Sequence, residues 1–181
     1  MTATGIVRRI DDLGRVVLPK ELRRNLRLRS GTPMEIFTEN DGTVRLRKYS
    51  PIRDNTETVQ ELAESIAQVC GHVVIVTDMD TIIAAAGNDA LNGKEISVSL
   101  ETAITARKPV TVKDRSQFVH IISDADVPSA FDYAQEIIVP IIPEGDTEGA
   151  VVILTKSADL GEADMKVAQM AAAFIGNQMR L

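Results

Sequence analysis

Residues 4–24 of the chain read TGIVRRIDDLGRVVLPKELRR, and this stretch decides how the amino-terminal part folds. Two short β-prone runs, residues 6–10 and 15–18, flank the turn-forming group Asp-Asp-Leu-Gly. We therefore expect the two runs to form a β-hairpin. Pro19 suits the first position of a helix, and apolar residues recur at helical spacing after it until Gly31. This spacing predicts a helix of about three turns.

A second hairpin is expected over residues 34–49. Two β-prone runs surround an Asn-Asp-Gly sequence at residues 40–42, and Asp-Gly favours a tight turn. Strand alternation places Arg45 and Arg47 on one face of this hairpin and apolar residues on the other. The first fifty residues are thus predicted to form a ββαββ unit.

A unit of this size buries too little apolar surface to offset its chain entropy, and such units usually depend on a metal, disulfides or a partner chain. The only cysteine is Cys70, which cannot form an intrachain disulfide, and no local histidine cluster accompanies it. We interpret Cys70 as a small buried hydrophobic residue. An intertwined homodimer is therefore the physical expectation for the amino-terminal unit.

The net charge of the chain is −6, but the charge is divided unequally along the sequence. Residues 1–50 hold eleven basic and six acidic side chains, a net charge of +5, whereas the remainder has a net charge of −11. Such asymmetry indicates a nucleic-acid-binding end joined to a domain of different purpose. The alternative, on charge alone, is a basic module that merely balances an acidic one.

The stretch over residues 4–24 resembles the AbrB-type swapped-hairpin DNA-binding domain, and the resemblance covers roughly residues 3–50. It implies a dimeric β-barrel built from swapped hairpins. It also implies that arginines of the first hairpin and of the short helix contact double-stranded DNA. In this sequence those side chains are Arg8, Arg9, Arg15, Arg23 and Arg24.

Guanidinium groups suit this role because they bind phosphate oxygens and guanine edges bidentately and stay charged at any working pH. The alternative for the helix arginines is a solvated face with ion pairs to nearby acids, and we favour it for Arg27 and Arg29. A surface of hairpins and short helices favours recognition through phosphate position and groove shape.

The chain after Pro51 has the pattern of an α+β domain. Its expected helices are 59–70, 96–106 and 162–179, and its expected strands are 73–77, 81–86, 109–113, 136–142 and 150–155. A helix, antiparallel strands and a terminal helix occur in this order in GAF-like and PAS-like sensor domains. We place the domain limits at 1–50 and 56–181, with a linker at 51–55.

An AbrB-like module followed by an acidic domain of this size resembles a family of sporulation regulators whose carboxy-terminal domain is GAF-like. GAF-like domains enclose a pocket between the sheet and its loops. Whether the domain binds a small molecule or is purely architectural stays open in the sequence, and polar side chains within residues 114–132 are candidates to line such a pocket. Nothing in the sequence identifies that ligand.

The helices expected at 59–70 and 162–179 have apolar stripes that indicate association between subunits. The stripe of the terminal helix is broader than one sheet face needs. We therefore expect dimerisation through both domains, up to a homotetramer. The alternative is that both helices only cover their own sheet.

The sequence does not favour an enzymatic function, and we expect no cofactor. There is no glycine-rich phosphate loop, no Gly-x-Ser-x-Gly and no metal-spaced histidine pair, and we interpret His72 and His120 as structural. The alternating acids at 78 and 80, and at 124 and 126, lack the glycine and terminal glutamate of an EF-hand. We interpret them as solvated loop residues.

The sequence therefore predicts a DNA-binding transcription regulator of sporulation genes, an activator or a repressor. Without an apolar signal segment or membrane span, we expect it in the cytoplasm, associated with the nucleoid. One alternative is an antitoxin, although the second domain is too apolar and periodic for the disordered tail that wraps a toxin. The other is a sensor whose amino-terminal module only dimerises.

Overall fold

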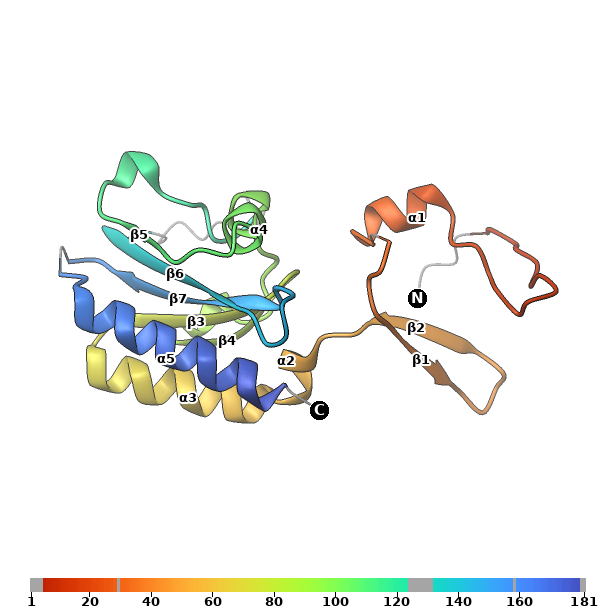
Figure 1. Cartoon of the computed structure of the whole chain (residues 1–181), viewed down its shortest axis with the longest axis horizontal. Helices are drawn as coiled ribbons and strands as arrows, with labels where there is room; N and C mark the ends of the chain where they lie inside the picture. The colour runs from red at the N-terminus through yellow and green to blue at the C-terminus, as the bar shows by residue number, and fades with distance from the viewer. Residues whose placement is uncertain (1–4, 29, 124–131, 158, 180–181) are drawn as a thin grey trace. The chain divides into compact units, whose positions relative to one another are not determined.

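The computed structural model describes residues 5–28, 30–123, 132–157 and 159–179. The chain divides into two compact units, Met1–Tyr49 and Ser50–Leu181, and each is described by itself (Figure 1). The stretch expected as a linker, residues 51–55, contains the short helix α2 (Pro51–Asp54), in which Ile52 is fully buried.

The second expected hairpin of the first unit is confirmed. Strands β1 (Met34–Thr38) and β2 (Val44–Lys48) pair antiparallel, with Ile36 opposite Leu46. The turn between them contains Gly42 at φ 85°, a left-handed conformation that glycine adopts without a steric penalty.

Helix α1 (Lys20–Asn25) is shorter than the spacing predicts. Instead of continuing toward Gly31, the chain adopts a left-handed conformation at Arg27, with φ 51°. The N–H of Leu28 then donates to the carbonyl of Arg23 at 2.7 Å, which closes the helix end. No residue of α1 is buried, so packing does not extend the helix.

Residues 5–19 form the expected turn, but the strands predicted at 6–10 and 15–18 are not formed in the single chain. The N–H of Asp11 donates to the carbonyl of Arg15 at 3.0 Å. No other backbone hydrogen bond joins the two arms of this turn, residues 5–10 and 15–19, within the described residues. A strand needs a hydrogen-bonded neighbour, and the described residues of this unit offer none. Its large apolar side chains are consequently exposed: Ile6, Val7, Ile10, Leu13, Val16 and Val17.

The second unit is built on a five-stranded antiparallel sheet with the order β4-β3-β7-β6-β5. The strands are β3 (Val73–Asp78), β4 (Ile82–Ala86), β5 (Val110–Val112), β6 (Gln135–Ile141) and β7 (Gly149–Thr155). The central strand β7 and its neighbour β6 are buried along their whole length, as expected for strands covered on both faces.

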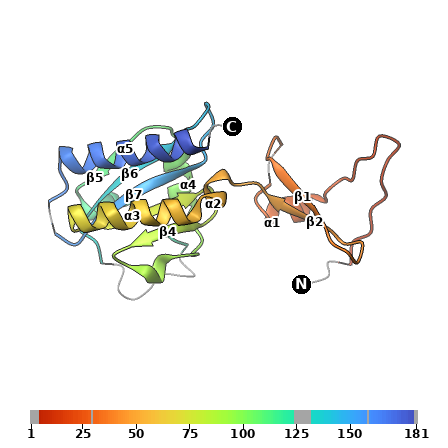
Figure 2. The same cartoon turned by 90° about the horizontal axis from the view of Figure 1, so that it is seen from below.

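Helices α3 (Thr56–Cys70) and α5 (Glu162–Gln178) lie side by side over one face of this sheet (Figure 2). Helix α4 (Val98–Thr105) and two short 3₁₀ helices, η1 (Asp89–Leu91) and η2 (Arg115–Gln117), belong to the opposite face. Each face carries its own apolar core, which confirms the predicted α+β fold with flanking helices. None of the described helices is long and apolar enough to cross a bilayer.

The α3 boundaries follow directly from sequence signals. Val59, Ala63 and Ile66 recur at helical spacing and are buried against the sheet. Gly71 ends the helix at φ 71°, and its N–H donates to the carbonyl of Ala67 at 2.9 Å.

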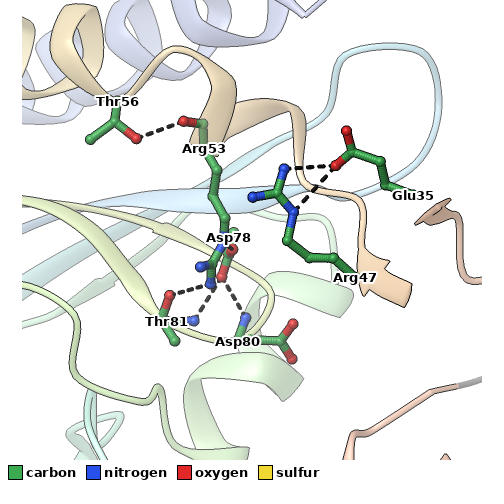
Figure 3. Close-up of polar contacts among 7 residues, drawn as sticks. All are labelled: Glu35, Arg47, Arg53, Thr56, Asp78, Asp80 and Thr81. Atoms are coloured by element: carbon green, nitrogen blue, oxygen red, sulfur yellow. Dashed lines mark hydrogen bonds and ion pairs between the residues drawn. The ribbon is translucent and has the colours of Figure 1, made fainter. Parts of the chain in front are cut away.

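Asp78, expected on a solvated loop, is instead buried at the end of β3, with 3% of its surface exposed. Its Oδ1 accepts the N–H groups of Asp80 and Thr81 at 2.8 and 2.7 Å, and its Oδ2 accepts Nε of Arg53 at 2.7 Å (Figure 3). The prediction was wrong because the partner, Arg53, lies 25 positions earlier in the sequence. The similar pair at 124 and 126 lies outside the described residues.

Candidate DNA-binding site

Arg15 is held by the turn that the two arms of the first unit share. The Asp11 Oδ2 accepts Nε of Arg15 at 2.8 Å, and its Oδ1 accepts the N–H groups of Arg15 and Leu13 at 2.9 and 3.0 Å. The N–H of Arg15, followed by its side chain, lowers the pKa of Asp11 below its usual value. The turn therefore keeps Asp11 ionised and holds the Arg15 guanidinium beside it.

Arg8 and Arg9 lie on the extended arm before this turn, and both are exposed. Nη1 of Arg8 donates only to the carbonyl of its neighbour Val7, at 3.1 Å. Arg9 makes no ion pair with any described residue. Both guanidinium groups therefore remain available for an anionic partner.

Arg23 and Arg24 occupy the last turn of α1 and are also exposed. Within the described part of the chain neither forms an ion pair, and no hydrogen bond joins them to the arms that carry Arg8, Arg9 and Arg15. The five predicted contact residues therefore form two groups in the single chain, one at the turn and one on α1.

The arginines of the second hairpin differ from Arg8, Arg9, Arg23 and Arg24 because their charges are already paired. Arg47 donates to Oε2 of Glu35 at 2.7 Å (Figure 3). Its guanidinium group also lies over the ring of Phe37, with 4.9 Å from Cζ to the ring centroid. Arg45 pairs with Glu39. Both side chains therefore hold the hairpin together, which supports assigning DNA contact to the other arginines.

The second unit contains a buried carboxyl group that the sequence pattern did not single out. Glu136 on β6 is 1% exposed, and its Oε1 accepts the N–H of Val119 at 2.6 Å. Its Oε2 has no hydrogen-bond partner among the residues that the structure describes. Burial raises the pKa of Glu136 to about 7, and the hydrogen bond from Val119 only partly opposes this rise.

The two units together define a class of protein, and comparisons with known families agree. Residues 56–180 match the family described as stage V sporulation protein T C-terminal, transcription factor. Residues 7–54 match the family described as antidote-toxin recognition MazE, bacterial antitoxin. A DNA-binding module of this kind joined to a GAF-like domain makes the chain a transcription factor rather than an enzyme.

The whole chain is similar to stage V sporulation protein T of Bacillus subtilis (strain 168), with 44% identity over 182 residues that cover 99% of each protein. It therefore belongs to the stage V sporulation protein T family. The transition state regulatory protein AbrB of the same organism is 47% identical over 51 residues, which cover 28% of this chain and 52% of that relative. The predicted AbrB-like module is thereby confirmed.

Solved structures confirm the GAF-like fold of the second unit. A methyl-accepting chemotaxis protein, residues 122 to 287, superposes with a TM-score of 0.60 at 20% identity, covering 70% of this chain and 89% of that one. The cofactor-binding GAF domain of the nutrient sensor CodY from Clostridium difficile superposes with a TM-score of 0.53 at 15% identity. The match covers 70% of this chain and 92% of that one.

Proposed function

We propose that this transcription factor binds double-stranded DNA through Arg8, Arg9, Arg15, Arg23 and Arg24. The observation that carries the proposal is the exposure of guanidinium groups in a unit of net charge +5, with Arg8, Arg9, Arg23 and Arg24 free of ion pairs to described residues and Arg15 paired with Asp11 of its own turn. Such groups displace counterions from the phosphate backbone, whereas the paired Arg45 and Arg47 would first have to release their carboxylates.

The active form is a homo-oligomer. The arms at residues 5–19 leave six large apolar side chains exposed and their backbone groups largely unpaired, which is costly for a unit this small. A second copy would supply the missing strand neighbours, join the two groups of arginines on one surface and bury the apolar side chains. Val69, Met170 and Phe174 leave further apolar surface on α3 and α5, which supports association of dimers into a tetramer.

The second unit senses a small molecule and thereby alters DNA binding. The CodY domain that it resembles in fold is described as binding a cofactor, which supports the same kind of role here. A ligand shifts the regulator between states only if it binds one of them more tightly. A DNA target would give the protein a site of action in the cytoplasm, at the nucleoid, and we expect that target to include genes of sporulation.

The decisive experiment compares two double variants of the full chain by fluorescence anisotropy on duplex DNA. Arg23→Ala/Arg24→Ala removes two proposed contacts, and Lys108→Ala/Lys166→Ala removes the same charge from the second unit. We expect the first to weaken binding by roughly tenfold or more and the second to leave it unchanged. Adding Arg8→Ala and Arg15→Ala should abolish binding while light scattering shows the same oligomer. Equal binding by both double variants would refute the assignment.

A further inference from the structure

The second unit contains a solvent-open cavity of about 500 Å³ at one end of the sheet. Strands β5 and β7 end beside it and β6 begins there, so three loops distant in sequence meet at this edge. The cavity is lined by Lys113, Asp114, Arg115, Asp132, Tyr133, Ala134, Gln135 and Lys156. Its volume lies within the usual range for small-molecule sites.

Basic side chains are concentrated around this cavity. The chain from residue 51 to its end has only nine basic residues against twenty acidic ones, yet Lys113, Arg115 and Lys156 line the same hollow. They come from the ends of β5 and β7 and from η2. Like charges brought together repel one another, and an anion bound between them would relieve that repulsion.

The two acidic residues of the cavity are already engaged. Asp132 pairs with Nη1 of Arg115 at 2.6 Å, which orients that guanidinium group. Asp114 accepts both the N–H and the hydroxyl of Ser116 at 2.9 Å, and the N–H bond contributes most to lowering its pKa. These carboxylates therefore hold the loop in place.

The two lysines are not engaged in this way. Within the described part of the chain, neither Lys113 nor Lys156 forms an ion pair, and both are exposed. Tyr133 adds a fixed apolar wall, because it is 3% exposed and its hydroxyl oxygen accepts Nδ2 of Asn88 at 2.9 Å. The cavity thus combines two exposed lysines, one oriented guanidinium group and an apolar wall formed by a buried tyrosine.

We propose that this cavity binds a small anion, a carboxylate or phosphate ester, and that this anion is the ligand class which the second unit senses. The inference rests on the proposed sensing function. Arg115 would bind one anionic group through the guanidinium nitrogens that Asp132 does not engage, and Lys113 and Lys156 would contact the same group from the neighbouring strand ends. DNA is a poor fit because the domain has a net charge of −11 and the cavity itself contains two carboxylates.

Titration calorimetry on the full chain, with ionic strength held constant by sodium chloride, tests this site. The probes are inorganic phosphate and citrate, which separate a phosphate site from a carboxylate site. We expect at least one probe to bind, with affinity reduced about tenfold or more in Lys113→Ala/Lys156→Ala and unchanged in Lys108→Ala/Lys166→Ala. Circular dichroism checks that both variants fold like the parent.

Two outcomes would overturn the proposal. One is that neither probe binds the unaltered protein at millimolar concentration, and the other is that both double variants bind a probe equally well. DNA binding is also measured without any probe, so that a failure of the anion site can be distinguished from a failure of the proposed DNA-binding function. Lys113→Ala/Lys156→Ala should bind DNA like the parent, and a loss there would indicate a direct DNA contact and contradict the small-anion site.

Discussion

Nε of Arg53 lies 2.7 Å from Oδ2 of the buried Asp78, and this ion pair ties helix α2 to the turn between β3 and β4 (Figure 3). A second guanidinium nitrogen of Arg53 donates to Oγ1 of Thr81 at 2.7 Å. Since α2 follows the unit boundary at Tyr49 almost at once, the first turn of the second unit is anchored to its sheet.

Replacing Asp78 with Ala should destabilise the second unit by about 2–3 kcal/mol. The change removes the acceptor of two backbone N–H groups and of Arg53 at a position that water does not reach. Arg53→Ala should cost less, about 1 kcal/mol, because 42% of the Arg53 side chain is exposed. Urea denaturation followed by circular dichroism measures both. Arg115→Ala, which breaks an exposed pair, serves as the control, and equal losses in all three variants would contradict this account.

The stability of the second unit should fall as pH rises from about 4.5 to about 7. Folding raises the pKa of Glu136 from 4.5 to about 7, so the unfolded chain loses this proton first and is favoured as pH rises through that window. The free energy of unfolding should decrease by at most about 3 kcal/mol, and the decrease should level off above pH 7. Glu136→Gln removes this titration, so its unfolding free energy should depend less on pH there. Parallel curves for the parent and the variant would show that Glu136 does not titrate as described.

A methyl group at position 149 should prevent the second unit from folding. A Cβ on Gly149 would lie 1.8 Å from the carbonyl oxygen of Thr77 and 2.8 Å from Cδ1 of Ile52. Neither β3 nor the buried Ile52 side chain of α2 can move away without breaking its own packing. Gly145→Ala is the matched control because nothing lies within 4 Å of its added Cβ, although φ 101° adds strain of about 1–2 kcal/mol. A cooperative melt of Gly149→Ala close to that of the control would contradict the packing described here.

DNA affinity should decrease steeply with salt. Five arginines from each of two subunits would release several counterions, and a protein with six to ten phosphate contacts loses roughly 10³–10⁵ in affinity between about 50 and about 200 mM salt. The slope of log affinity against log salt should be shallower for Arg23→Ala/Arg24→Ala than for the parent. A flat dependence would exclude the phosphate model and point to contacts of another kind.

Most elements of the second unit were predictable because their signals are local. The helix that ends at Gly71 and the strands now assigned to β3, β6 and β7 follow from apolar periodicity and from glycine at a helix end. The short helix α2 was missed because its single buried side chain, Ile52, produces no periodic pattern.

The candidate sites were predictable only in part. Arg8, Arg9, Arg15, Arg23 and Arg24 were identified from a dense family motif, and they are exposed in the structure. The basic cavity was not foreseen, although residues 114–132 were expected to line a pocket. Lys113 and Lys156 are 43 positions apart, and only the pairing of β6 with both β5 and β7 brings them to one edge.

Charge, local propensity and a contiguous motif were enough to predict a basic AbrB-like module followed by an acidic α+β domain, because they need no knowledge of distant contacts, and the family resemblance added that this domain is GAF-like. The sequence by itself also determined that the first module is too small to bury its apolar residues alone. The tertiary structure alone decided that Asp78 is buried against Arg53, that Glu136 holds its proton to about pH 7, and that three cations share a cavity. Each of these depends on burial or on strand order, and those properties arise only when segments far apart in the chain pack together.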